Sequence, residues 1–375
     1  MRFIRQDTFT IALDARDLAR DREHASTRYL TQLYKHVLEL KPYWQVIGYH
    51  RSTPPDELVN LPGYSPRLMN IPGDQFNSWQ QVRLPITALL SGVDLLHCPA
   101  QNCPRWVPRP TIITVNDLQA DRSRQTLAQA CARAAAITCT SNYIAHQIQS
   151  AFTISPHVIH VCPWSGNIEQ KPITEPLVRQ VMDKFRVTKP YVLHFGSDMN
   201  MSSTCRMLES WAMLPRQLRK KWQLLIVDLD GTDQRGLLSL AGRLGTDKSV
   251  ILHGHISEDE LPVLFGCGWI LACPSMSESQ TPHILNAFNT GTAVLTSNHN
   301  GLAETAGDAA VKAEANCTAS IYKALLRLMK ESDFRNELVE RGKQRVKEYT
   351  WRNSARQFID CVESVRSVGQ RRLAA

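Results

Sequence analysis

The sequence lacks any apolar run of the ~18–20 residues that a membrane-spanning helix needs. Its first eight residues, Met1 to Thr8, contain no apolar segment of signal-peptide length. These absences argue against an integral membrane protein and against export. They predict a cytoplasmic location.

Paired cysteines are also missing, although the chain has ten cysteines. They are dispersed singly, with no Cys-x-x-Cys pair and no Cys/His cluster at zinc-finger spacing. This dispersal favours a reducing compartment over a disulfide framework. It also predicts that the protein has no metal site.

Several familiar catalytic motifs are absent. The sequence has no Walker loop, no Gly-x-Ser-x-Gly elbow, no His-Glu-x-x-His and no Gly-x-Gly-x-x-Gly. Their absence argues against a P-loop NTPase, a serine hydrolase of the elbow type, a zinc protease and a dinucleotide-binding dehydrogenase. Any enzymatic function must therefore come from another arrangement of residues.

Acidic residues are fewer than basic ones, and the formal net charge is +8 with a pI near 9.0. This excess favours phosphates, anionic lipid surfaces or nucleic acid as partners. The basic residues are scattered, however, and the densest groups, Arg216–Lys221 and Arg366–Arg372, fall on predicted helix ends or a tail. Such groups are typical of solvated helix faces, so we expect no nucleic-acid partner.

The chain does contain two sets of apolar, β-branched runs that alternate with helical patterns, which is typical of doubly wound α/β folds. With 375 residues it is long enough for two domains. A Pro-containing stretch from Pro163 to Pro190 separates the sets and holds a short helix near residues 177–185. The predicted strands are Phe9–Asp14, Gln45–Tyr49, Asp94–His97, Thr111–Val115, Ala136–Cys139, Val158–Val161, Tyr191–Phe195, Gln223–Val227, Val250–His253, Trp269–Cys273 and Ala293–Thr296.

The most informative segment lies between the last two of these strands. The buried run ends at Pro274-Ser275, and a helix is expected to begin near Pro282. This geometry puts Glu278 at the carboxyl edge of a parallel sheet and points the free N–H groups of the helix toward a ligand phosphate. The segment therefore predicts an anion-binding site.

The same segment resembles the donor loop of retaining, family-4-type glycosyltransferases (glycosyl transferases group 1), which have the GT-B fold. Their pattern runs Pro-Ser, Glu-Gly-Phe-Gly-Leu-Pro, Glu-Ala and a Gly before a strand. The spacing matches throughout, with Glu278 at the first acid, Asn286 at the second and Gly291 at the closing glycine. The residues Ser279, Thr281 and His283 stand where the family has Gly, Gly and Pro.

The resemblance covers nearly the whole chain, from Ala12 to Trp351. It implies two Rossmann-like domains facing a central cleft: an acceptor domain over residues 1–170 and a nucleotide-sugar domain over residues 171–350. It also implies that residues 351–375 form a helix that returns to the first domain, followed by a tail.

The resemblance further assigns catalytic residues. Thr114-Val-Asn-Asp117 matches a family pattern in which a His lies beside the transferred sugar, so Asn116 and Asp117 take that position. Asn116 cannot titrate but can hydrogen-bond a sugar hydroxyl. Glu278 would contact the sugar from the other domain. Asp117 is equally well interpreted as a residue that caps a loop.

The donor diphosphate would lie after Gly196-Ser197, where the family has an Arg and a Lys. The aligned residues here are Met201, Ser202 and Ser203, and none of them is charged. Each charge-assisted contact to phosphate is worth roughly 1.5–3 kcal/mol, so two neutral replacements weaken the site. Arg206 follows one turn later, and its side chain either reaches back to the site or remains an exposed helix arginine.

Three further positions bear on the donor. Asn286 would contact the nucleotide ribose with an amide in place of a carboxylate. His283 either donates to a phosphate or sugar hydroxyl or is an ordinary loop residue. Asp228 stands where the family usually has Gly, and it adds negative charge near the expected diphosphate.

The resemblance therefore predicts a retaining glycosyltransferase that transfers a hexose from a nucleotide-sugar donor in surface-glycan or polysaccharide biosynthesis. No metal or cofactor is expected, and the acceptor would be a glycan or lipid-linked glycan, with a peripheral membrane contact left open. One alternative is a catalytically impaired homologue that binds glycans or stabilises a second glycosyltransferase subunit. A third interpretation is a sugar-nucleotide epimerase.

Overall fold

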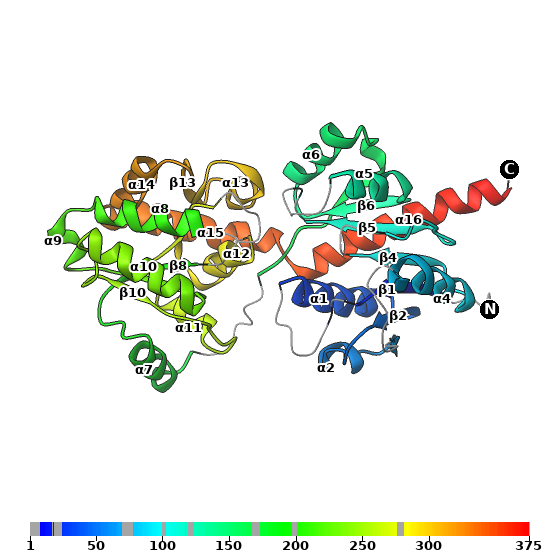
Figure 1. The fold of residues 1–375 in the computed structure, drawn as a ribbon, viewed down its shortest axis with the longest axis horizontal. Coiled ribbons are helices and arrows are strands. Elements are labelled where there is room, and N and C mark those ends of the chain that lie inside the picture. Colours follow the sequence, from blue (N-terminus) through cyan, green and yellow to red (C-terminus); the bar gives the residue numbers. More distant parts are fainter. Residues whose placement is uncertain are drawn as a thin grey trace. The chain divides into compact units, whose positions relative to one another are not determined.

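The computed structural model describes residues 8–16, 18, 25–69, 78–99, 103–116, 118, 124–166, 173–196, 201–275 and 281–374, with only the backbone of residues 25, 26, 281 and 369–374. The chain divides into two compact units (Figure 1). Unit 1 comprises Met1–Trp164 and Thr350–Ala375, and unit 2 comprises Ser165–Tyr349. Each unit is built around its own parallel sheet.

Unit 1 contains a seven-stranded parallel sheet in the order β3-β2-β1-β4-β5-β6-β7. Because successive side chains of a strand point to opposite faces, Ile11 and Leu13 of β1 join one core and Ala12 joins the other. The strands are β1 (Phe9–Asp14), β2 (Trp44–His50), β3 (Tyr64–Leu68), β4 (Leu95–Cys98), β5 (Thr111–Val115), β6 (Ala136–Cys139) and β7 (Ile159–Val161).

Helices cover both faces of this sheet. On one face, α1 (Ala25–Leu40) packs beside α16 (Trp351–Ala374), the last helix of the chain, so the carboxyl-terminal helix belongs to unit 1. The other face is covered by η1 (Trp79–Arg83, a π-helix), α4 (Leu84–Leu90), α5 (Arg124–Arg133) and α6 (Asn142–Phe152). The short α2 (Asp56–Val59) and η2 (Pro156–Val158) precede β3 and β7.

Unit 2 contains a six-stranded parallel sheet in the order β10-β9-β8-β11-β12-β13. The order reverses direction between β8 and β11, which is where α/β sheets bind ligands beyond the carboxyl ends of their strands. The strands are β8 (Tyr191–Phe195), β9 (Gln223–Val227), β10 (Val250–Leu252), β11 (Ile270–Cys273), β12 (Ala293–Ser297) and β13 (Ala310–Ala313).

The helices of unit 2 also form two layers. One core receives side chains from α8 (Met201–Ala212), α10 (Gly231–Arg243), α14 (Thr318–Lys330) and α15 (Ser332–Arg345). The other receives them from α7 (Glu175–Lys184), α11 (Leu261–Gly266), α12 (Thr281–Thr290) and α13 (Asn300–Ala306). The short α9 (Arg216–Arg219) and η5 (Val346–Glu348) complete the described elements.

The predicted doubly wound fold with two parallel sheets is confirmed. All eleven predicted strands are present with ends within one residue of the prediction. Two strands were missed, β3 and β13, and both lie at the edges of their sheets. Residues 65–68 of β3 are exposed and include Pro66, so the alternating apolar pattern that marks a buried strand is absent there.

The chain passes between the units twice, at Trp164–Ser165 and at Tyr349–Thr350. On the unit 1 side, Trp164 stacks on Tyr29 with ring centroids 5.3 Å apart, and Trp351 packs on the same tyrosine at 5.8 Å. The Ser354 hydroxyl donates to the Pro163 carbonyl at 2.5 Å. Aromatic packing and this hydrogen bond therefore fix both segments of unit 1 where they leave it.

Candidate functional site

The carboxyl end of β8 is closely packed at Gly196. The Gly196 amide donates to the carbonyl of Val227 at 2.8 Å. A Cβ atom at this position would lie 2.4 Å from Cδ2 of the buried Leu229, so a larger residue would displace that side chain. Glycine is therefore the residue that fits beside Leu229 at the end of β8. Ser197, the next predicted ligand residue, lies outside the described residues.

The first turns of α8 bring three predicted residues together. Arg206 Nε donates to the Ala315 carbonyl at 2.8 Å, and its Nη2 lies 3.4 Å from the hydroxyls of both Ser202 and Ser203. Ser202 is exposed and Ser203 is buried. The guanidinium thus folds back toward the amino terminus of α8. It adds a permanent positive charge to the positive end of the helix dipole there.

A buried histidine holds this helix turn to the sheet. His194 of β8 contacts the Ala272 carbonyl of β11 through Nδ1 at 2.7 Å and the Thr204 hydroxyl through Nε2 at 3.1 Å. A carbonyl oxygen can only accept, so Nδ1 carries the proton and Nε2 accepts from Thr204. Burial lowers the pKa of His194 to about 4, which keeps the ring neutral. This role was not predicted from the sequence, although a lone His within an apolar strand is a detectable signal.

The amino-terminal turn of α12 lies against the end of β8. The His283 ring stacks on Phe195 with centroids 3.8 Å apart and an interplanar angle of 11°. Phe195 in turn stacks on Phe265 at 5.5 Å. His283 is therefore part of an aromatic stack at the carboxyl edge of the sheet. The predicted residues Glu278 and Ser279 and the side chain of Thr281 lie outside what the structure describes.

Asn286 lies inside unit 2, on the face of α12 that meets the segment after Ser165. Its side chain is 3% exposed. A Cβ atom on Gly166 would lie 3.0 Å from Asn286 Oδ1 and 2.8 Å from Asn289 Nδ2. The backbone of Gly166 therefore covers the amide of the predicted ribose contact. The predicted closing glycine, Gly291, has φ +75° and leads from α12 into β12.

Helix α13 begins at a residue that the sequence analysis did not single out. Asn300 has φ +64°, and its Oδ1 accepts from the Leu302 amide at 3.0 Å and from the Ser297 hydroxyl at 3.3 Å. Its Nδ2 lies 3.5 Å from the carbonyl of Ser275, the last described residue before the predicted donor loop. Asn300 thus joins α13 to the base of that loop. The Asn-Gly dipeptide at this position was the available signal.

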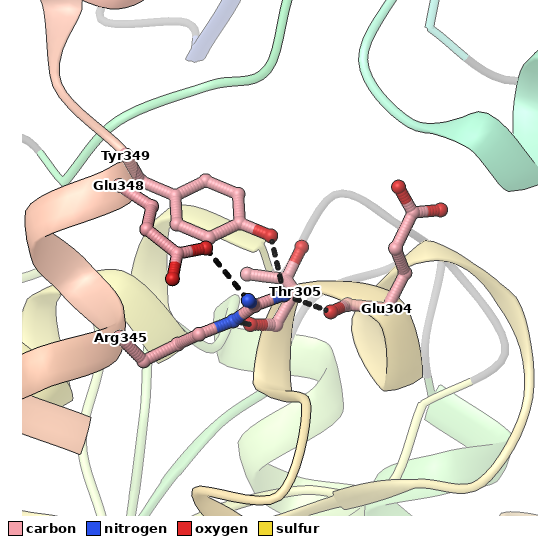
Figure 2. Close-up of polar contacts among 5 residues, drawn as sticks. All are labelled: Glu304, Thr305, Arg345, Glu348 and Tyr349. Carbon is pink, nitrogen blue, oxygen red and sulfur yellow. Dashed lines mark hydrogen bonds and ion pairs between the residues drawn. The ribbon is translucent and has the colours of Figure 1, made fainter. Parts of the chain in front are cut away.

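The other end of α13 is held by Arg345, as Figure 2 shows. Its Nε and Nη2 donate to the carbonyls of Thr305 and Glu304 at 3.2 and 2.9 Å. The same guanidinium reaches Glu348 Oε2 at 2.7 Å and the Tyr349 hydroxyl at 3.1 Å. The Glu304 carboxylate projects away from this cluster (Figure 2). Arg345 therefore satisfies the last carbonyls of α13 and fastens them to the end of unit 2.

Asp228 follows β9 with φ +61°, a conformation in which glycine is at no disadvantage. Its amide donates to the Gly254 carbonyl at 3.0 Å, and its carboxylate lies 3.8 Å from His255 Nδ1. The resembling family usually has Gly at this position. The positive φ gives that preference a physical reason.

In unit 1, the predicted residue Asn116 directly follows β5. Its Oδ1 is buried and has no hydrogen-bond partner among the residues that the structure describes. Buried amide oxygens are nearly always paired, so this acceptor has unused capacity. Asp117, its predicted neighbour in the site, lies outside the described residues.

Three general features complete the description. All ten cysteines are free. Within the described ranges, no three His, Cys, Asp or Glu side chains gather in a way that could hold a metal ion. In the same part of the chain, no helix combines the length and apolar character required to cross a membrane.

Comparison with known proteins identifies the second half of the chain. Residues 182–345, which hold nearly all of unit 2, match the family described as Glycosyl transferases group 1. The chain carries a glycosyl transferases group 1 domain. This domain includes β8, the first turn of α8, α12 and α13, which are the elements that form the candidate site.

Curated relatives are mannosyltransferases of Escherichia coli. Over 182 residues, the chain is 26% identical to the O-antigen chain mannosyltransferase B, a match that covers 48% of each protein. Over 187 residues, it is 22% identical to the serotype-specific mannosyltransferase WbdA, covering 49% of this chain and 23% of WbdA. The chain therefore matches less than half the length of these relatives.

Solved structures resemble the chain over nearly its full length. A glycosyltransferase from Rickettsia africae ESF-5 matches with a TM-score of 0.74 and 13% identity, covering 96% of this chain and 99% of that one. HepE from Anabaena in complex with UDP and glucose gives 0.74 and 12%, covering 95% and 100%. WaaG, a glycosyltransferase involved in lipopolysaccharide biosynthesis, gives 0.70 and 17%, covering 94% and 99%. The predicted GT-B fold is confirmed.

Proposed function

We propose that this chain is a retaining glycosyltransferase that transfers a hexose from a nucleotide-sugar donor during assembly of a surface polysaccharide. The group 1 domain supports the reaction class. The mannosyltransferase relatives make mannose the first sugar to test. The likeness to HepE, whose structure holds UDP and glucose, supports a nucleotide-sugar donor.

The contact of Arg206 with Ser202 and Ser203 carries this proposal. A donor diphosphate carries negative charge that increases when the bond between the anomeric carbon and the phosphate oxygen breaks. The chain has serines where the resembling family has its Arg and Lys, yet Arg206 supplies a cation at the same helix turn. Together with the α8 amino terminus, this guanidinium would stabilise the leaving diphosphate.

The remaining predicted residues would complete the donor and sugar contacts. The Asn116 oxygen, which has no hydrogen-bond partner among the described residues, would accept a hydrogen bond from a sugar hydroxyl, because it is buried and has acceptor capacity left. Asp117 and Glu278 would contact the transferred sugar, and Asn286 the ribose. Gly196, Ser197, Ser279, Thr281 and His283 would surround the diphosphate and sugar.

Calorimetric titration of the full chain with GDP, UDP, GDP-mannose and UDP-glucose tests donor binding. We expect one pair of nucleotide and nucleotide sugar to bind, and Arg206→Gln to raise its Kd by about tenfold to a hundredfold, since one charge-assisted contact is lost. Arg179→Gln is a matched control, because Arg179 is in α7 with its side chain 76% exposed. Equal Kd values for Arg206→Gln and wild type would remove the main support for this site.

The reaction itself is tested by product analysis. The chain is incubated with the sugar nucleotide that binds and a mannose-terminated oligosaccharide, and released nucleoside diphosphate and glycan are measured by mass spectrometry and NMR. Transfer with retained anomeric configuration is expected. If no ligand binds in the titration, the interpretation as a partner-stabilising subunit replaces the enzyme. If binding occurs and a new sugar nucleotide forms without transfer, the chain is an epimerase.

A further inference from the structure

An open pocket of about 490 Å³ lies between α5 and α6 of unit 1. Both helices cover the same face of the sheet, and Figure 1 shows them next to β5 and β6. Neighbouring helices normally pack roughly 8–10 Å apart with interdigitating side chains, which leave few voids larger than a water molecule. The volume of this pocket is instead typical of small-molecule sites, which are ~300–1,000 Å³. We call this pocket the α5/α6 groove.

The apolar part of the α5/α6 groove is continuous with the core of unit 1. Leu127 of α5 is 6% exposed and belongs to that core, and Leu118 and Phe152 pack against it. All three side chains also line the groove. Ile144 and Ile148 of α6 are buried in the same core, so the neighbouring face of that helix borders the groove. The packing of the core therefore forms the groove before any ligand binds.

Hydrogen-bonding side chains form a row along one side of the groove. Tyr143, Gln147 and Ser150 lie on one face of α6, at intervals of four and three residues, and all three line the groove. The row is ~10 Å long, because an α-helix rises ~1.5 Å per residue. Gln147 Nε2 donates to the Tyr143 hydroxyl at 2.8 Å, which orients the phenol ring. Tyr143 is 36% exposed, so part of its ring is open to a ligand.

Two further polar side chains, those of Arg124 and His146, line the groove and are exposed. The guanidinium offers several N–H donors in one plane, and the amide, hydroxyl and imidazole groups can both donate and accept. A sugar ring has matching chemistry, because its C–H faces are apolar and its hydroxyls both donate and accept. An aromatic ring and apolar side chains beside a row of polar groups therefore suit a carbohydrate.

The groove begins beside a residue of the candidate site. Asn116 and Leu118 are two residues apart, so their Cα atoms lie within about 7 Å of each other. Asn116 is the residue whose buried oxygen we expect to contact the transferred sugar. After transfer, that sugar becomes the end of the acceptor chain. A glycan whose end lies at Asn116 can therefore continue past Leu118 into the groove.

We propose that the α5/α6 groove binds internal sugars of the acceptor glycan, so that the acceptor is an oligosaccharide and not a single sugar. A nucleotide fits less well, because Arg124 is the only permanent cation among the described residues that line the groove. A wholly apolar ligand would leave the polar groups of Gln147 and Ser150 without partners. The inference deepens the proposed function and rests on it only in taking the acceptor to be a glycan.

Calorimetric titration of the full chain with mannose, mannobiose and mannotetraose, without nucleotide, tests the groove. The Kd should fall by at least about tenfold from mannose to mannotetraose, because added sugars gain contacts along the row. Tyr143→Ala should raise the Kd for mannotetraose by about tenfold, whereas Tyr143→Phe, which keeps the ring, should stay within about threefold of wild type. Tyr43→Ala is the matched control, since Tyr43 is a 51% exposed tyrosine between α1 and β2 of the same unit.

Equal Kd values for mannose and mannotetraose, or for mannotetraose with wild type and Tyr143→Ala, overturn the proposal. Displacement of mannotetraose by GDP would assign the groove to a nucleotide and overturn it as well. In a transfer assay, Tyr143→Ala should raise the KM for mannotetraose and leave kcat unchanged, which a general loss of structure would not do.

The Kd for nucleotide, measured in parallel, should not change in Tyr143→Ala. Glycan binding that depends on Tyr143 in a chain that binds no nucleotide would remove the proposed function and leave this site. Nucleotide binding and transfer, with a glycan affinity that does not depend on Tyr143, would remove this site and leave the proposed function. The two proposals can therefore fail separately.

Discussion

Each of the two units has a histidine in the middle of its parallel sheet, and the two histidines have different structural roles. His97 of β4 and His194 of β8 are both fully buried, and burial lowers their pKa values from 6.5 to about 3 and about 4. Both rings are therefore neutral at pH 7, and each is held by two hydrogen bonds. The difference lies in the elements that those bonds connect.

In unit 1 the histidine belongs to a network of side chains within the core. His97 contacts the Tyr34 hydroxyl of α1 at 2.7 Å and the Thr114 hydroxyl of β5 at 2.8 Å. Thr114 continues the network to Thr138 of β6 at 2.7 Å, and Phe358 of α16 packs on the His97 ring at 5.0 Å. This network ties α1 to three strands. We infer that its main contribution is to the stability of unit 1.

In unit 2 the histidine connects the sheet to the candidate site. His194 accepts from Thr204, which lies in the first turn of α8 between Ser203 and Arg206. The bond fixes the helix turn where we expect the diphosphate to bind. Similar burial and similar pKa shifts at the two sheet centres therefore do not imply similar roles, because the partner residue decides what each histidine positions.

A drop in pH should give the largest loss of stability among these predictions, because it acts on both histidines. Their folded-state pKa values are lowered, so the unfolded chain binds protons first, and stability falls as the pH drops below about 6.5. Between pH 7 and pH 5 each histidine should reduce the free energy of unfolding by about 2 kcal/mol. Denaturant titrations at several pH values measure the slope of the free energy of unfolding against pH. It should be smaller in His97→Leu and in His194→Leu, and unchanged slopes in both variants would contradict the shared burial effect.

His97→Leu should lower the free energy of unfolding at pH 7 by about 3 kcal/mol, because it leaves the buried hydroxyls of Tyr34 and Thr114 without a shared partner. Denaturant unfolding of the full chain measures this loss. Nucleotide affinity should stay within about twofold of wild type, since no element of unit 2 is altered. A large loss of nucleotide binding by the folded variant would show that the comparison between the units is wrong.

His194→Leu should cost less stability, about 2 kcal/mol, because only one hydroxyl and one carbonyl lose their partner. Its distinguishing effect should be a Kd for nucleotide that rises by about fivefold to tenfold, since the first turn of α8 loses its tie to the sheet. Calorimetric titration measures this change. His97→Leu is the control, because both variants remove a buried imidazole. Equal nucleotide Kd values in the two variants would exclude a positioning role for His194.

Most of the fold could be predicted from the sequence because central parallel strands are buried on both faces. Such strands appear as short apolar runs, and those of β5, β6, β8 and β9 were predicted with the observed ends. The edge strands β3 and β13 have exposed residues and short, mixed sequences, so periodicity alone gives no signal for them.

Less of the candidate site could be predicted. The motif spacing located Ser202, Ser203 and Arg206, but it left open whether the arginine turns back, since that depends on the Ala315 carbonyl 109 residues away in the sequence. The contacts of Arg345 with the end of α13 depend on a similar long-range approach. Local patterns can identify such residues, whereas their partners are set by tertiary packing.

The two passages of the chain between the units have a consequence for engineering. Ser165 and Tyr349, the first and last residues of unit 2, are joined by a hydrogen bond of 2.6 Å from the serine hydroxyl to the tyrosine carbonyl. Unit 2 is thus an insertion whose first and last residues are in contact. The two segments of unit 1 that flank it can therefore be rejoined by a short linker. Unit 2 can accordingly be excised, expressed alone or exchanged for the corresponding unit of a related chain by cutting at these two points.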